Sequence, residues 1–161
     1  MDLKIETVIK GAFAVIGKEG STCEEPGFIQ RLWTQANTHF GEVAHLAVKT
    51  PNSHLAGIWG AMTDFSRSFL PWEENFSQGL YLAGVECHID AEAPVGWSRW
   101  IIPGFEYLRV ECDRDGVFPE MIDYLQKRNI PLAGAVHDYT CPESGKNYMY
   151  FPIRRLTESD S

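Results

Sequence analysis

Residues 97–127 decide the fold, and they read WSRWIIPGFEYLRVECDRDGVFPEMIDYLQK. Aromatic and β-branched residues dominate the first half of this stretch and predict an extended chain, interrupted at Pro103-Gly104 by a bend or bulge. Asp115-Gly116 then marks a turn, and apolar residues recur at helical spacing over residues 118–127. The stretch therefore predicts a long strand followed directly by an amphipathic helix.

The same order of elements occurs in both halves of the chain. After the helix, residues 133–140 and 148–153 predict two strands joined by the turn 141–145. In the first half, a strand with a bend at Gly11 precedes a helix that starts at the capping-box spacing of Thr22-Cys-Glu-Glu25. Two further strands then follow, over residues 55–62 and 80–88. The chain thus predicts strand–helix–strand–strand twice, without a repeat at the level of sequence.

Two such units predict an α+β fold in a single domain, residues 1–156. The modules, about 3–90 and 95–156, are expected to form one largely antiparallel sheet with both helices on one face. The opposite face would lack a helical cover and become concave through the twist of the sheet, which makes it the expected ligand groove. We expect the tail, residues 157–161, to be disordered.

Composition narrows the classes of function. The net charge is −8, and no basic cluster is longer than Arg154–Arg155, so direct binding to nucleic acid is not expected. No apolar run approaches the roughly 20 residues that span a membrane, and the N-terminus lacks a signal-peptide pattern. Four cysteines without paired spacing predict reduced thiols and a cytoplasmic protein. His137 and Cys141 lack further ligands at suitable spacing, so neither a metal nor a cofactor is expected.

Three motifs resemble a known family. They are Gly84-Val85-Glu86, then Ile102-Pro103-Gly104 followed by Tyr107, and the sequence YMYFPI at 148–153. Their order and spacing resemble GyrI-like domains, also called AraC-type or bacterial transcription-activator effector-binding domains. The resemblance covers residues 3–156 and is sharpest over 81–153.

The resemblance implies two α/β modules related by a pseudo-twofold axis, with a ligand groove between them. Members bind hydrophobic, often cationic compounds, and some are fused to helix-turn-helix domains as drug-responsive regulators. Others stand alone, including the DNA gyrase inhibitor and integron-cassette proteins, and a subset hydrolyses cyclopropane-containing genotoxins. This chain resembles the standalone form. It has Tyr148 and His137 where members often carry a glutamate, which leaves the charge of the ligand open.

Alternation along the predicted strands selects the residues that would face the groove. A carboxylate among aromatic rings suits a cation, so Glu86 is the expected anchor, unless it pairs with Arg99 or Arg109 or is solvated. Trp72 lies in an irregular segment that forms either a lid or a small satellite cluster. Only the resemblance draws attention to His137. The predicted ligand-binding residues are Glu86, Tyr107, Tyr150, Tyr148, Trp59, Phe105, Arg109, His137 and Trp72.

These residues predict a small-molecule binding protein that sequesters or senses a hydrophobic, aromatic, cationic compound. One alternative is a hydrolase of strained electrophiles in which Glu86, Tyr107 and His137 act as acid–base groups, although the sequence shows no characteristic nucleophile–base pair. A second alternative is a protein-interaction module of the gyrase-inhibitor type, with a protein partner instead of a small molecule.

Overall fold

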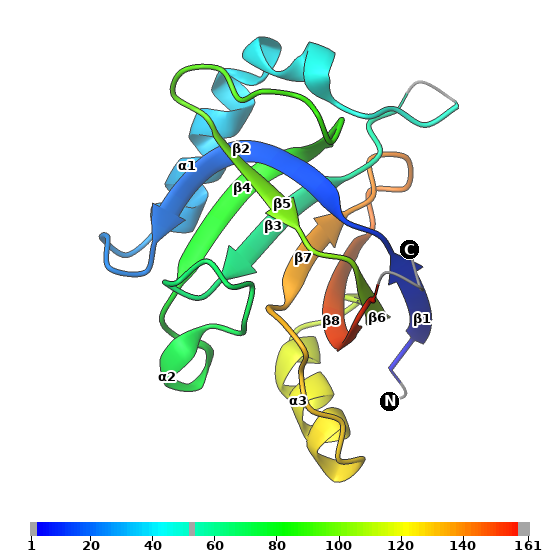
Figure 1. Cartoon of the computed structure of the whole chain (residues 1–161). Helices are drawn as coiled ribbons and strands as arrows, with labels where there is room; N and C mark the ends of the chain where they lie inside the picture. The colour runs from blue at the N-terminus through cyan, green and yellow to red at the C-terminus, as the bar shows by residue number, and fades with distance from the viewer. Residues whose placement is uncertain (1–2, 52–53, 158–161) are drawn as a thin grey trace.

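The computed structural model describes residues 3–51 and 54–157, so most of the tail expected to be disordered lies outside the described residues. The fold is α+β, as predicted, with eight strands in one antiparallel sheet (Figure 1). In the first half the elements are β1 (Ile5–Lys10), β2 (Phe13–Ser21), α1 (Phe28–Thr38), two short 3-10 turns (Phe40–Glu42 and Ala44–Leu46), β3 (Ile58–Thr63), the short α2 (Glu73–Phe76) and β4 (Leu80–Cys87). In the second half they are β5 (Ser98–Ile102), β6 (Phe105–Glu111), α3 (Val117–Lys127), β7 (His137–Thr140) and β8 (Asn147–Arg155).

The two breaks that were predicted as bends separate complete strands. β1 and β2 do not pair with each other; β1 pairs with β6, and β5 pairs with β2. The first strand of each half therefore crosses to the edge of the other half. Gly11 and Pro103-Gly104 lie at these crossings, where the chain leaves one edge of the sheet for the other. Pairing between strands far apart in sequence decides this arrangement, and local sequence patterns do not report it.

The strand order is β1-β6-β8-β7-β3-β4-β2-β5. If each strand of the first half is exchanged with its counterpart in the second half (β1 with β5, β2 with β6, β3 with β7 and β4 with β8), this order is reversed. The two halves are therefore related by a pseudo-twofold axis that passes between β3 and β7. The two long helices also begin in the same way, because each follows a glycine with positive φ: Gly27 before α1 (85°) and Gly116 before α3 (86°). A glycine adopts this left-handed conformation without steric cost. The first helix therefore begins after Gly27, and not at the predicted capping box of Thr22 and Glu25. Instead, the Glu24 carboxylate accepts the backbone N–H of Ser21 one turn earlier, at 2.7 Å.

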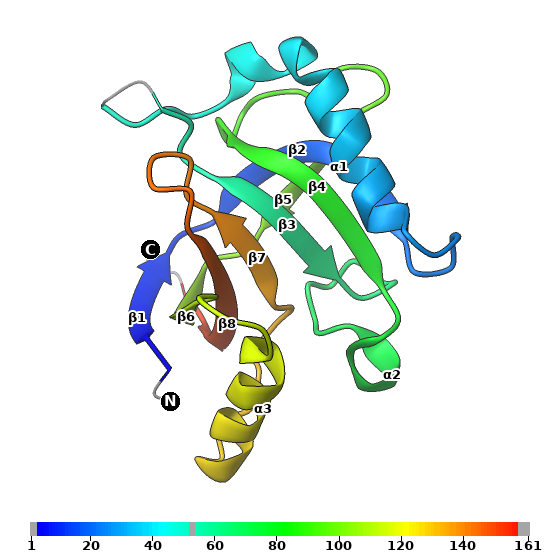
Figure 2. The same cartoon turned by 180° about the vertical axis from the view of Figure 1, so that it is seen from behind.

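Both long helices pack on the same face of the sheet, as predicted. α1 lies against β2 and β4, and α3 against β6 and β8 (Figure 2). The helix-facing side chains of the strands form three apolar clusters, around Ile16 and Val85, around Tyr81 and Ala83, and around Val110 and Phe151. The described helices include none that is long and apolar enough to cross a membrane.

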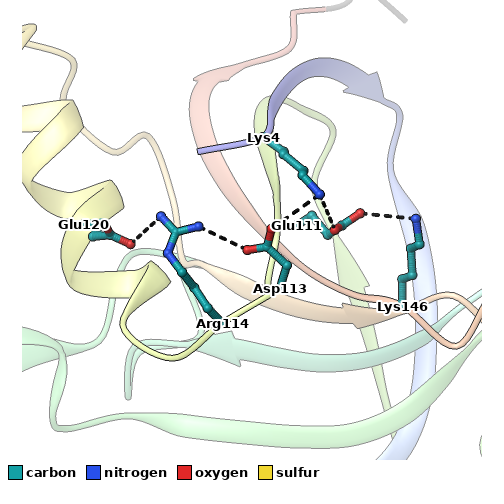
Figure 3. Close-up of polar contacts among 6 residues, drawn as sticks. All are labelled: Lys4, Glu111, Asp113, Arg114, Glu120 and Lys146. Atoms are coloured by element: carbon teal, nitrogen blue, oxygen red, sulfur yellow. Dashed lines mark hydrogen bonds and ion pairs between the residues drawn. The ribbon is translucent and has the colours of Figure 1, made fainter. Parts of the chain in front are cut away.

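A chain of ion pairs fixes the start of β1 beside the second half (Figure 3). Lys4 lies 3.2 Å from Glu111 and 3.4 Å from Asp113, and Arg114 links Asp113 to the first turn of α3. Each pair is partly exposed to solvent and contributes at most about 1 kcal/mol. The six residues of this network are Lys4, Glu111, Asp113, Arg114, Glu120 and Lys146.

The face opposite the helices differs from the bare groove that the sequence predicted. Its aromatic side chains form a buried cluster of their own, in which Trp59 is 1% exposed and Tyr107 and Phe105 are fully buried. The sheet is strongly twisted (Figure 1). Residues of β2, β5 and β6 meet in this cluster. Phe69, from the segment after β3, covers part of it and contacts the ring of Trp100 at 6.0 Å. The protein's own side chains therefore fill this face.

Candidate functional site

Eight of the nine expected site residues lie on the face opposite the helices; strand alternation had selected seven of them, and only the resemblance had drawn attention to His137. Glu86 pairs in register with Val15, and Tyr150 pairs with both Arg109 and His137, which places these side chains on the face opposite the helices. We call this set the aromatic face. Its predicted members are Glu86, Tyr107, Tyr150, Tyr148, Trp59, Phe105, Arg109 and His137. Whether they bind a ligand stays a prediction.

Trp72 does not form the lid over the groove that was one of its two predicted alternatives. It packs on the helix side of the sheet with Met62 and Tyr81, and its indole N–H donates to the carbonyl of Leu80 at 2.9 Å. The segment before β4 returns toward the helices and carries Trp72 with it. Trp72 therefore does not cover the aromatic face, where Phe69 takes the position of a lid residue.

Trp59 lies at the centre of the aromatic face. Its ring is 4.9 Å from Phe13, 4.8 Å from Tyr139 and 4.9 Å from Tyr150, measured between centroids. Such ring pairs stabilise a fold by about 0.5–1.5 kcal/mol each beyond the burial of their area. The excess of aromatic residues in the composition is thus used largely for packing.

Glu86 has a partner that the sequence did not indicate. Its carboxylate accepts the indole N–H of Trp59 at 3.3 Å and forms an ion pair with Lys10 at 3.2 Å. Arg109, one of the expected partners, instead pairs with Glu6 and lies over the ring of Tyr148 at 5.0 Å. Lys10 was missed because its strand, β1, was predicted as a continuation of β2.

Three buried polar atoms of the aromatic face have no hydrogen-bond partner among the described residues: the hydroxyl of Tyr107, Nε of Arg109 and Nε2 of His137. His137 Nδ1 accepts the backbone N–H of Met62 at 3.0 Å, which assigns the proton of the neutral ring to Nε2. Burial lowers the pKa of His137 to about 3 and raises that of Tyr107, so both are neutral at pH 7. Neither group hydrogen-bonds to Glu86, so the three candidate acid–base groups are not assembled into a catalytic unit.

Asp138 is a site residue that the sequence analysis missed. It follows His137 in β7, so its side chain points to the opposite face, toward the helices. There it lines a cavity of about 220 Å³ to which both halves of the chain contribute. The lining residues are Met62, Trp72, Phe76, Phe118, Val136, Asp138 and Met149. We call this the Asp138 cavity.

The Asp138 cavity continues toward α3. A second hollow of about 360 Å³ shares Trp72 and Phe76 with it and reaches Ile122 and Pro131. The rings of Phe76 and Phe118 meet edge to face, with centroids 5.5 Å apart. The two neighbouring hollows are thus aromatic and mainly apolar, and the one carboxylate among their described lining residues is that of Asp138.

The carboxylate of Asp138 forms no hydrogen bond or ion pair with any described residue. Burial raises its pKa to about 6, because no neighbouring positive charge offsets the loss of hydration. At neutral pH this cavity therefore contains a negative charge without a counterion. The alternation of β7 gave a signal for this, since a carboxylate at that position falls on the helix-facing side, where an apolar residue is expected. Among the described residues, no group of three or more His, Cys, Asp and Glu side chains is placed to hold a metal ion.

Comparisons with known proteins find similarity in structure only. No sequence family matches the chain, and no curated protein does. An integron cassette protein from the mobile metagenome of Vibrio cholerae aligns at 13% identity over 95% of this chain and 97% of its own, with a TM-score of 0.53. SAV2435, solved with bound tetraphenylphosphonium, aligns at 16% identity over 96% and 94%, with a TM-score of 0.57. A protein from Staphylococcus aureus MU50 named for bacterial transcription regulation aligns at 16% identity over 96% and 99%, with a TM-score of 0.52. At these identities the chain shares the fold of these proteins.

The unpartnered hydroxyl of Tyr107 gives a prediction for stability. Tyr107→Phe removes a buried donor that has no acceptor, so the free energy of unfolding stays unchanged or rises by about 1 kcal/mol. Tyr81→Phe is the matched control, because the buried Tyr81 hydroxyl accepts the indole N–H of Trp33 at 3.0 Å and its loss costs about 1 kcal/mol. Urea unfolding measures both. Equal destabilisation by the two substitutions would show that the Tyr107 hydroxyl has a partner.

Asp138 and its neighbour His137 predict opposite dependences of stability on pH. The folded pKa of Asp138, about 6, is above the unfolded value of 3.8, so its contribution to stability is lost as the pH rises through 6. Relative to the unaltered protein, Asp138→Asn therefore gains on the order of 2 kcal/mol between pH 4 and pH 7. The folded pKa of His137, about 3, is below the unfolded value of 6.5, so His137→Asn gains a similar amount as the pH falls from 7 to 5. Urea midpoints across pH that shift in parallel for both variants would contradict these assignments.

Proposed function

We propose that this protein binds a hydrophobic, aromatic organic cation in the Asp138 cavity. The observation that carries the proposal is the carboxylate of Asp138, which lies without a partner beside the rings of Trp72, Phe76 and Phe118. Ring faces attract a cation with about 0.5–2 kcal/mol each, depending on desolvation. An arriving cation would also stabilise the charged form of the carboxyl group.

Size and shape support a ligand of moderate bulk. The Asp138 cavity and the adjoining hollow along α3 together reach the range of small-molecule sites, which hold a few hundred Å³. Their lining is predominantly apolar and includes one charged group, the carboxylate of Asp138. A ligand would place its positive centre near Asp138 and its aromatic body toward Ile122 and Pro131.

The shared fold supports the same class of ligand. SAV2435 was solved with tetraphenylphosphonium, a cation surrounded by four aromatic rings. Together with the motifs at 84–86, 102–104 and 148–153, the shared fold supports our proposal that the chain is a cytoplasmic GyrI-like effector-binding domain that senses or sequesters its ligand. In this proposal Asp138 takes the role of acidic anchor that the sequence assigned to Glu86, because Glu86 is already paired with Lys10.

The decisive test compares a cation with a neutral molecule of similar shape. Asp138→Asn is expected to weaken tetraphenylphosphonium at least tenfold and triphenylphosphine oxide less than twofold, because only the cation loses a charge partner. Calorimetry gives both dissociation constants, and the fluorescence of Trp72 reports occupation of the cavity. Glu86→Gln is the control for the aromatic face and should leave both ligands unchanged. Equal losses for cation and neutral molecule, or a larger loss in Glu86→Gln, would refute Asp138 as the anchor.

A further inference from the structure

A separate cavity lies under α1, in the first half of the chain. Its volume is about 110 Å³, and it is bounded by the helix on one side and by β2, β3 and β4 on the other. It shares no lining residue with the Asp138 cavity or with the hollow that adjoins that cavity. Its walls include Trp33, Ala36, Val43, Ile58, Val85 and Trp97. We call this the α1 cavity.

A comparison of the two halves explains why space remains under α1. Both long helices have 11 residues, and each buries three side chains at intervals of four residues. In α3 the third of these side chains is Leu125, whereas in α1 the residue at the same position is Ala36. Because the alanine side chain ends at Cβ, the space that a leucine takes in the second half is not filled from the helix in the first. The α1 cavity lies at this position.

The lining of the α1 cavity is apolar and uncharged. None of its described residues has a titratable side chain, and its one polar side chain, that of Asn37, is exposed. The two tryptophans use their indole N–H groups elsewhere. That of Trp33 donates to the Tyr81 hydroxyl at 3.0 Å, and that of Trp97 donates to the Glu42 carboxylate at 2.8 Å. A charged group placed here would lose its hydration without gaining a partner, so the lining favours a neutral ligand.

We propose that the α1 cavity is a second ligand site, which binds a small neutral molecule with one aromatic ring. An apolar protein cavity of about 150 Å³ stays free of water and binds benzene, and the α1 cavity is of the same order. The rings of Trp33, Phe40 and Trp97 provide the edge and face contacts that an aromatic ligand makes. This site goes beyond the proposed cation site, because it lies under the other helix and selects against charge.

Toluene tests the proposal, with benzylammonium as the charged molecule of similar shape. We expect toluene to shift the indole N–H signals of Trp33 and Trp97 in nuclear magnetic resonance spectra. The signals of Trp59 and Trp100, on the other face of the sheet, and of Trp72, in the Asp138 cavity, should stay in place. Benzylammonium should leave the signals of Trp33 and Trp97 unchanged, because the α1 cavity has no partner for its charge.

Ala36→Leu is the variant that fills the cavity, since it introduces the side chain that α3 has at Leu125. It should weaken toluene at least tenfold, measured by titration of the same signals. Gln35→Leu is the matched control, because Gln35 is the exposed neighbour in α1 and does not line the cavity. That variant should keep the affinity within about twofold. If Ala36→Leu does not fold, Ala36→Val, with a shorter side chain, should weaken toluene about threefold.

The proposal is overturned if toluene leaves the signals of Trp33 and Trp97 unchanged, or shifts that of Trp59 or Trp72 in their place. It is also overturned if the variants at Ala36 bind toluene as tightly as the unaltered protein, or if Gln35→Leu weakens it equally. None of these results bears on the Asp138 cavity, whose failure would appear as absence of tetraphenylphosphonium binding by the unaltered protein. The two proposals therefore fail separately.

Discussion

The exchange of first strands between the two halves is the constraint on which the rest of the structure depends. β1 completes the edge beside β6, and β5 completes the edge beside β2, so neither half has its full sheet without the other. The crossings bring the aromatic side chains of β2, β5 and β6 into one cluster. They also bring Lys10 to Glu86, which lies 76 residues later in the chain. The junction of β3 with β7, where the halves meet, places Asp138 beside residues of both.

The two faces of the sheet differ in whether their charged side chains have partners of opposite charge. On the aromatic face, Glu86 and Arg109 each have a partner of opposite charge from β1, and rings fill the space between them. On the helix side, the charge of Asp138 has no such partner among the described residues, and burial raises the pKa of its carboxyl group. An unpaired carboxylate in an apolar cavity costs stability in the free protein. A cationic ligand offsets this cost, which gives the Asp138 cavity a physical reason to select positive charge.

Local patterns in the sequence predicted much of the fold. The period of two along the strands placed seven expected residues on the correct face, and the apolar spacing of 118–127 located α3 within one residue. The local patterns missed the features that depend on pairing between distant strands. Residues 5–17 were predicted as one strand, so neither the crossing of β1 nor the position of Lys10 could be derived. The same alternation placed Asp138 among apolar side chains, and its charge there was the available signal for the cavity. Trp72 was misplaced because no period governs an irregular segment.

The central claim is that the ligand cavity lies on the helix side of the sheet, at Asp138. A crystal structure of the protein grown with tetraphenylphosphonium tests this most directly. The account predicts the phosphonium in the Asp138 cavity, with its rings against Trp72, Phe76 and Phe118 and the aromatic face unchanged. A ligand seated instead among Trp59, Tyr107 and Tyr150, with those side chains displaced, would contradict it.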